Sequence, residues 1–282
     1  MSRNLYLSVI KTPFFVAQEY FHRIPDPTFN WSFSPTRADV DVGKAVSRLK
    51  EDGLVQFPAY FNGKFLASLK RVFDALMAER SEGGCGNPNA EYCENILDFD
   101  STLLEAALDS TLLEVTGRYY GKKFAIGRAD ALRIFPVESC RYGSFQWHHD
   151  GRGRQIKAQI LLTDLEPDGQ CMTYVKGSHK SYYTHGRGKH QGSRFERDIT
   201  NGPNPSEGVV NVAGPAGTVI LFDTNGLHSG NRNNSATRDT LTIYYSTGGN
   251  FKPLHYRRVH LAGLPQEKRR VLLQNPRHEL ID

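Results

Sequence analysis

Two residues with metal-binding side chains, His148 and Asp150, stand two positions apart in segment 144–151 of this 282-residue chain. In a β-strand, alternate side chains point to the same face, so the imidazole and the carboxylate project together while His149 points away. His149 has only Gly151 at the same spacing, which favours His148. These two groups are two thirds of a 2-His-1-carboxylate iron site. A surface His-Asp pair is the alternative, so the iron hypothesis requires a second histidine from a distant strand.

A candidate for that histidine is His228, which follows a predicted strand at 217–223. Arg238 stands ten residues further on, at the start of the next predicted strand. If neighbouring strands direct both side chains to one cavity, the three protein ligands leave about three positions of an octahedral metal open. The guanidinium is then suited to hold the far carboxylate of a dicarboxylic co-substrate by two parallel hydrogen bonds. His255 and His260 are weaker alternatives, because neither directly follows a strong strand with an arginine at that offset.

The composition limits the classes of protein to consider. The chain is 39% hydrophobic and 23% charged, and no segment approaches the ~18 consecutive apolar residues of a membrane span. Its first 20 residues lack the hydrophobic region and cleavage site of a signal peptide, so we expect a cytoplasmic protein without a membrane partner. Four cysteines without a C-x-x-C pair argue against a zinc ribbon and a disulfide scaffold. A net charge of +5 permits an anionic substrate but does not indicate nucleic acid.

The first part of the chain contains the predicted helices. Apolar periodicity and stop signals predict a helix at 43–52, a strand at 54–58 and a long helix from the N-cap Asn62 to about 83. The sequence Asp-Ser-Thr-Leu-Leu-Glu occurs at 100–105 and again at 109–114. It predicts two capped helical turns, with Ser101 and Ser110 as the N-caps.

From about residue 123 the chain becomes rich in short β segments separated by turn residues. The predicted strands are 123–126, 131–135, 143–149, 155–163, 171–176, 208–212, 218–222 and 240–245. About eight short strands after a helical part predict a mainly β fold with flanking helices: a double-stranded β-helix, or cupin-like jelly roll, with a helical N-terminal buttress.

We therefore predict one domain, 1–282, with three parts. Residues 1–122 are the mostly helical or irregular N-terminal part, 123–250 form the jelly-roll core, and 251–282 form a tail of irregular structure with one short helix. Within the core, 181–207 is too long for an ordinary connection, which is typical of a lid or a disordered segment. The basic residues of this loop are suited to grip an anionic substrate, although charge on a loop is more often only solvating.

The motifs in this order resemble the phytanoyl-CoA dioxygenase family of Fe(II)- and 2-oxoglutarate-dependent oxygenases. The resemblance spans about residues 50 to 250. Its motifs are segments 147–150, 169–180 and 217–223, together with His228 and Arg238.

The resemblance implies that His148, Asp150 and His228 bind iron and that Arg238 anchors 2-oxoglutarate, with Ser229 as a further donor to the same carboxylate. Related halogenases have a small residue in place of Asp150, so its presence speaks against halogenation. The implied reaction uses Fe(II), 2-oxoglutarate and O2. It hydroxylates an unactivated C–H bond of a small metabolite and releases succinate and CO2.

Two alternatives stay open beside hydroxylation. The same cofactors serve desaturation, epoxidation or ring formation in natural-product biosynthesis, and a non-catalytic cupin-like metal- or ligand-binding protein is the alternative from another class. Arg133, Gln146 and Arg152 flank or share the predicted iron strand and are the candidate contacts to an anionic group of a small-molecule substrate. Solvated loop charge is the competing interpretation for Arg152. The sequence indicates no oligomeric state.

Overall fold

The computed structural model describes residues 20–21, 23–83, 90–136, 147–150, 155–180, 208–230, 236–248 and 251–282. The predicted lid at 181–207 and the candidate substrate residues Gln146 and Arg152 lie outside these ranges. Within them, no helix combines the length and the hydropathy needed to cross a bilayer.

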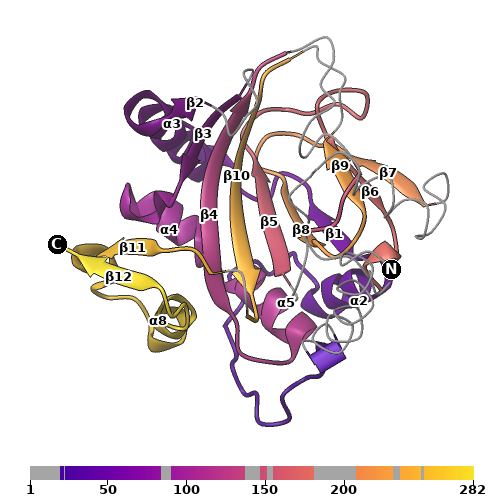
Figure 1. Cartoon of the computed structure of the whole chain (residues 1–282), viewed down its shortest axis with the longest axis vertical. Coiled ribbons are helices and arrows are strands. Elements are labelled where there is room, and N and C mark those ends of the chain that lie inside the picture. The colour runs from indigo at the N-terminus through magenta and orange to yellow at the C-terminus, as the bar shows by residue number, and fades with distance from the viewer. Residues whose placement is uncertain are drawn as a thin grey trace, which may run out of the picture.

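A seven-stranded antiparallel sheet forms the centre of the fold (Figure 1). Its strands, in spatial order, are β1 (Leu54–Phe57), β8 (Val219–Asp223), β5 (Gln155–Leu161), β10 (Arg238–Ser246), β4 (Ala125–Ile134), β3 (Ala90–Glu94) and β2 (Glu82–Gly83). Because alternate residues of a strand face opposite sides, each central strand presents one row to each side of the sheet.

Helices cover one face of this sheet. They are α2 (Val42–Asp52), α3 (Gly63–Arg80), α4 (Ser101–Ala107) and α5 (Ser110–Tyr120), with the short 3-10 helix η1 (Ile96–Asp98) before α4. Leu241, Ile243 and Tyr245 of β10 belong to the same buried cluster as the apolar residues of these helices. These three residues and Asp239 form the helix-facing row of β10, and Arg238, Thr240, Thr242 and Tyr244 form the row on the opposite, inner face.

A small antiparallel sheet packs over part of that inner face. It contains β7 (Val209–Val212), β6 (Met172–Val175) and β9 (His228–Gly230), and a 3-10 helix, η3 (Ser178–Lys180), follows β6. Met172 and Tyr174 of the small sheet share a buried cluster with Ile220 and Phe222 of β8. The two sheets therefore contact each other through side chains, and residues that point inward from either sheet meet between them.

The predictions for the first helices are confirmed closely, since α2, β1 and α3 lie within a few residues of the predicted ranges. The N-cap positions of the two short helices were predicted one residue too late. Asp100 accepts a hydrogen bond from the backbone N–H of Thr102, and Asp109 accepts one from that of Leu112. A carboxylate at the N-cap also suits the positive end of the helix dipole, which explains why it replaces the serine we expected.

Two predictions for the β part are wrong. The expected separate strands at 123–126 and 131–135 are one ten-residue strand, β4. Arg128 and Asp130, which lie between the two predicted strands, belong to β4, where they share its inner face and pair with each other. The tail 251–282 is also more regular than predicted.

That tail contains β11 (Leu254–Arg257), α7 (Arg258–Leu261), α8 (Gln266–Leu273) and β12 (His278–Ile281). The two strands pair in parallel beside β4, on the side of the large sheet away from β6, β7 and β9 (Figure 1). Asn275 attaches this unit, because its side-chain amide donates hydrogen bonds to the backbone carbonyls of Ile126 and Lys252. Short elements held by such long-range contacts carry little periodicity in the sequence.

Candidate metal centre

His148 and His228 lie side by side although 80 positions separate them in the chain. Each donates its backbone N–H to the carbonyl of the other at 2.9 Å, and their ring centroids are 4.2 Å apart. His228 follows β8, as we had expected, and it is also the first residue of β9. In the described part of the predicted strand 143–149, only His148 forms a β-bridge.

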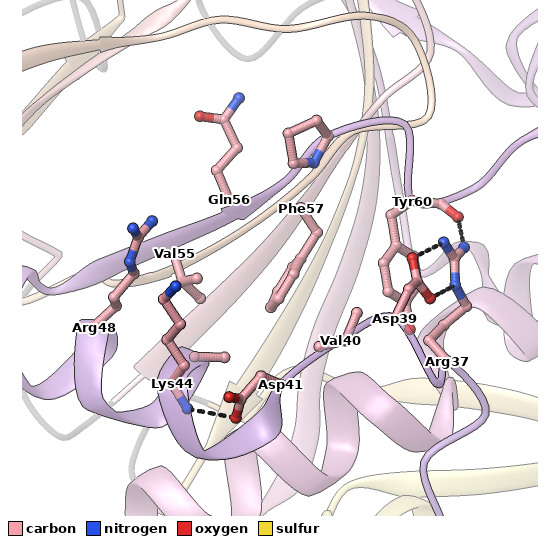
Figure 2. Close-up of a pocket in the computed structure, with 12 residues that line it drawn as sticks. Arg37, Asp39, Val40, Asp41, Lys44, Arg48, Val55, Gln56, Phe57 and Tyr60 are labelled. Atoms are coloured by element: carbon pink, nitrogen blue, oxygen red, sulfur yellow. Dashed lines mark hydrogen bonds and ion pairs between the residues drawn. The ribbon is translucent and has the colours of Figure 1, made fainter.

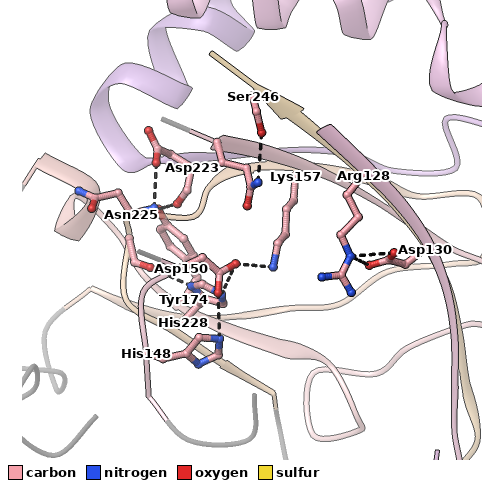
Figure 3. A network of polar contacts seen from close by, with 12 residues as sticks. Arg128, Asp130, His148, Asp150, Lys157, Tyr174, Asp223, Asn225, His228 and Ser246 are labelled. Carbon is pink, nitrogen blue, oxygen red and sulfur yellow. Dashed lines mark hydrogen bonds and ion pairs between the residues drawn. The ribbon is translucent and has the colours of Figure 1, made fainter. Parts of the chain in front are cut away.

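Asp150 completes the group. Its backbone N–H donates to the carbonyl of Thr224 at 2.8 Å. One carboxylate oxygen, Oδ1, lies 3.6 Å from Nε2 of His148, and the other, Oδ2, lies 3.9 Å from Nε2 of His228 (Figure 3). One potential ligand atom from each residue lies within 4.8 Å of those of the other two. Two imidazoles and one carboxylate are the donor set of a non-haem iron site with open positions.

The orientation of His228 leaves one nitrogen available to a metal. Its Nδ1 lies 2.8 Å from the carbonyl oxygen of Gly226, so Nδ1 carries the proton and donates it. Burial first, and then the neighbouring His148, lower the pKa of His228 to about 3, against the opposing effect of Asp150. The ring is therefore neutral near pH 7, with the lone pair of Nε2 directed to the group, which is the form that binds metals.

Asp150 is held in its ionised form. Burial is the largest single influence and raises the pKa of the Asp150 carboxyl group, but the Lys157 ammonium, His228 and His148 together outweigh it. The pKa of Asp150 is therefore well below its usual range. Lys157 Nζ lies 2.5 Å from Oδ2 of Asp150. No sequence pattern pointed to this lysine, because it reaches Asp150 only in the folded sheet.

A hydrogen-bonded turn sets the position of His228. Asp223 ends β8 and accepts hydrogen bonds from the hydroxyl of Tyr119 on α5 at 2.6 Å and from the backbone N–H of Asn225 at 2.9 Å. Its backbone carbonyl accepts a third from the hydroxyl of Tyr174 at 3.0 Å. The sequence signal for this turn is the pair Asp223 and Asn225, two short polar residues directly after a strand, which is an Asx-turn pattern.

Gly226 is required in this turn because a side chain there has no room. A Cβ atom at Gly226 would lie 1.9 Å from the Tyr174 hydroxyl oxygen. We expect Gly226→Ala to displace Tyr174, to cost about 1–3 kcal/mol of unfolding free energy, and to weaken metal binding by moving the carbonyl that orients His228. Urea unfolding and metal titration test this, with Gly117→Ala as the control, since the Cβ atom there would make only ordinary contacts, at 3.5 Å or more. An unchanged metal affinity in Gly226→Ala would contradict the role of the turn.

Arg238 is the buried cation of the inner face. Its side chain donates from Nη1 to the backbone carbonyl of Gln170 at 2.6 Å, while its Nε has no hydrogen-bond partner among the residues that the structure describes. The side-chain amide of Gln170 and the hydroxyl of Thr240, which shares the inner row of β10, are also buried without partners. Burial lowers the pKa of Arg238 to about 10. Unpartnered buried donors around a cation without a paired carboxylate make a site suited to an anionic ligand.

The structure does not bring Arg133 to this site. Arg133 lies opposite Asp239 of β10, on the helix-facing side, and makes two hydrogen bonds to that carboxylate at 2.8 Å each. A third joins it to Asp74 of α3 at 2.7 Å. Because Arg133 faces the helices and not the inner face of the sheet, its position argues against the substrate contact that we predicted.

Neighbouring residues of a strand face opposite sides, so Ser229 does not share the face of His228. In the small sheet Ser229 pairs with Thr173, whereas His228 pairs with Tyr174 on the inner side. Thr173 directs its hydroxyl to the exposed Asn211. Ser229 therefore belongs to the outer row of β9, which argues against a contact to a ligand held by Arg238.

Asp130, on the inner face of β4, is a second buried carboxylate. Arg128 pairs with it at 2.6 Å and also contacts Glu94 at 3.0 Å (Figure 3). Burial is the largest influence and outweighs Arg128, so the pKa of Asp130 is raised to about 6 from 3.8. Between these two pH values the folded protein holds a proton that the unfolded chain has lost, so stability falls as the pH rises through this window.

This effect is measurable with Asp130→Asn. From pH 4 to pH 6 we expect the wild-type unfolding free energy to fall relative to the variant by about 2 kcal/mol, because the full effect, at about 1.4 kcal/mol for each unit of pKa, extends beyond both ends of this range. Denaturant unfolding at several pH values provides the measurement. Parallel profiles for the two proteins would show that Asp130 does not titrate in this range.

A cavity of about 330 Å³ lies between α2 and β1, and Figure 2 shows the residues that line it. They include Arg37, Lys44 and Arg48, but no histidine and none of the residues described above. Arg37 is already paired with Asp39 at 2.7 Å. This cavity therefore contains no metal-binding donor set.

Comparison with known proteins connects these residues to a family. Residues 140–239 match the family model of phytanoyl-CoA dioxygenase (PhyH). A 116-residue part of the chain is 33% identical to an ectoine dioxygenase of Stutzerimonas stutzeri (strain A1501). That alignment covers 36% of this chain and 38% of the enzyme, so the chain matches less than half the length of this curated relative.

Solved structures share the fold at low sequence identity. The carbocyclase SnoK from nogalamycin biosynthesis has a TM-score of 0.61 at 21% identity, over 76% of this chain and 87% of its own. The epimerase SnoN, in complex with Fe3+, alpha ketoglutarate and nogalamycin RO, has 0.59 at 20%, over 73% and 83%. EctD from S. alaskensis, with 2-oxoglutarate and 5-hydroxyectoine, has 0.56 at 19%, over 80% and 84%. The profile match spans both histidines, Asp150 and Arg238, so residues 140–239 are similar to the phytanoyl-CoA dioxygenase family that the motifs resemble.

Proposed function

We propose that this protein is an Fe(II)- and 2-oxoglutarate-dependent oxygenase that hydroxylates an unactivated C–H bond of a small metabolite. The observation that carries the proposal is the convergence of His148, Asp150 and His228 from two distant segments. Asp150 is ionised and His228 is neutral near pH 7, and His228 directs one nitrogen to the group. These are the forms that bind a divalent metal, and so the group fits iron.

The surroundings of Arg238 support 2-oxoglutarate as the co-substrate. Its unpartnered Nε, with the side chains of Gln170 and Thr240, offers donors to the carboxylate of the ligand that is remote from the metal. A non-catalytic binding protein has no need for a buried guanidinium at this place. The relatives whose structures contain 2-oxoglutarate or alpha ketoglutarate support the same assignment.

In this mechanism the chain binds, orients and shields. His148, Asp150 and His228 would hold the metal, and Arg238 would hold and orient the co-substrate through its carboxylate. When bound, iron with 2-oxoglutarate and O2 supplies the oxidising power for C–H attack, with succinate and CO2 as products. Burial of all four side chains limits access of water to the centre.

Finer assignments of the fold, the reaction, the substrate and the location accompany the proposal. We interpret the two antiparallel sheets as a jelly-roll core and α2 to α5 as its helical buttress within a single domain. Ring formation with the same cofactors is the alternative outcome, because SnoK is named as a carbocyclase. The substrate is proposed to be a small molecule, and a cytoplasmic location stays a prediction.

Anaerobic titration tests the proposal. Fe(II) and then 2-oxoglutarate are added to the apo protein, and a weak visible metal-to-ligand charge-transfer band near ~500 nm is expected when the co-substrate chelates the metal. A substrate screen by succinate release then follows. Absence of the band would contradict the oxygenase assignment and favour a cupin-like binding protein.

A further inference from the structure

Lys157 is the one charged residue of the described chain that directly contacts the carboxylate of the metal centre. It lies on the inner row of β5, between Tyr244 of β10 and Phe222 of β8. Its Nζ is 4.9 Å from the ring centroid of Tyr244 and 5.9 Å from that of Phe222. The two rings restrict the side chain from both sides, and only 15% of it is exposed.

The contact is made to one oxygen of Asp150. Lys157 Nζ lies 2.5 Å from Oδ2, which also lies 3.9 Å from His228 Nε2, whereas Oδ1 lies 3.6 Å from His148 Nε2. A charge-assisted hydrogen bond to a carboxylate oxygen draws negative charge from it and makes it a weaker donor to a metal. The ammonium therefore weakens the hold of Asp150 on a cation.

The contact also changes the charge of the centre. Fe(II) with one carboxylate has a net charge of +1, and an adjacent ammonium raises this to +2. Arg238 lies further along the same inner face, so the row between it and Lys157 is bounded by a cation at each end. A dianion that spans the metal and Arg238 is attracted by both.

We propose that Lys157 is a positioning residue that sets the charge of the metal centre: its ammonium offsets the negative charge of Asp150 and thereby strengthens binding of the dianionic co-substrate at the expense of metal affinity. The proposal rests on the iron and 2-oxoglutarate assignment above. Its distinctive consequence is that loss of the ammonium changes cation and anion binding in opposite directions.

The test compares Lys157→Gln with the wild-type protein under anaerobic conditions, where no turnover occurs. Metal affinity is measured with Co(II) by calorimetry, and 2-oxoglutarate affinity is then measured on the Co(II)-loaded protein. We expect 2-oxoglutarate to bind about tenfold more weakly, and Co(II) to bind as tightly as to the wild type or more tightly. The Co(II) visible spectrum is expected to change because Asp150 becomes a stronger donor to the metal.

Two further variants make the result specific. Lys157→Arg retains the positive charge and is expected to restore most of the 2-oxoglutarate affinity. Lys176→Gln is the matched control, because it removes a lysine paired at 3.2 Å with Asp52 on the surface. Lys157→Met, which packs between the two rings without charge, replaces Lys157→Gln if that variant fails to fold.

Three outcomes would overturn the proposal. Unchanged affinities in both neutral variants would show that the ammonium does not act on the centre. A fall in both affinities would show that Lys157 only maintains the local structure. A wild-type protein that binds no divalent metal would contradict the proposed function itself, and the role of Lys157 with it.

Discussion

Replacing His228 with alanine is expected to abolish Fe(II) binding and every activity that depends on it. The substitution removes one of three protein ligands, whereas loss of a group that only supports a ligand already costs about 10- to 100-fold in metal affinity. We therefore expect the affinity to fall by more than about 100-fold. The visible band with 2-oxoglutarate should disappear, and succinate formation should drop to the level without enzyme.

His255→Ala is the appropriate control for this result. The sequence offered His255 as an alternative third ligand, but the structure places it in the C-terminal unit, where its ring contacts Asn95 at 3.1 Å and Glu279 at 3.3 Å. This variant should bind Fe(II) as the wild type does. If instead His228→Ala retains iron while His255→Ala loses it, the metal centre described above is wrong.

Arg238→Met should separate co-substrate binding from metal binding. Hydrogen bonds to charged groups contribute about 1.5–3 kcal/mol each, so the loss of a two-pronged contact should weaken 2-oxoglutarate by about 100-fold or more. Fe(II) affinity should change little, because Arg238 is not among the three clustered metal-binding residues. Calorimetric titration of Fe(II) into the apo variant measures the metal affinity, and titration of 2-oxoglutarate into the metal-loaded variant measures the co-substrate affinity.

The same substitution should leave the apo protein at least as stable as the wild type. Arg238 is 6% exposed and no carboxylate contacts it among the described residues, so the apo fold carries the cost of a buried charge. Methionine removes this cost and fills similar space. We expect the melting temperature of the apo variant to be equal or higher, and added 2-oxoglutarate to stabilise only the wild type. A strongly destabilised apo variant would show that the guanidinium is chiefly structural.

The local features of the fold could be predicted because they depend on local sequence. A few neighbouring residues are enough to predict the apolar stripe of α3, the end of α2 at Gly53 and the short β segments. His148 and Asp150 were recognised for the same reason, since their spacing of two is itself the signal. The errors at Ser101 and Ser110 were shifts of one residue within correctly expected helices.

The roles of single inner-face residues could not be predicted in the same way. Arg133 and Arg238 are both arginines of neighbouring strands, and only the register of β4 against β10 shows that they face opposite sides. Ser229 is adjacent to His228 in sequence and faces the other side of the small sheet. A shift of one residue reverses every side chain of a strand, and no local pattern sets that register here.

The sequence by itself determined the donor types, the spacing of His148 and Asp150, and the family that these motifs resemble. Only the tertiary structure decided that His228 lies within 4.8 Å of both, that Arg238 is buried among unpartnered donors, and that Lys157 contacts Asp150. The physical reason is that strand pairing joins residues far apart in the chain. The charge and protonation of each group then depend on neighbours that its own segment does not contain.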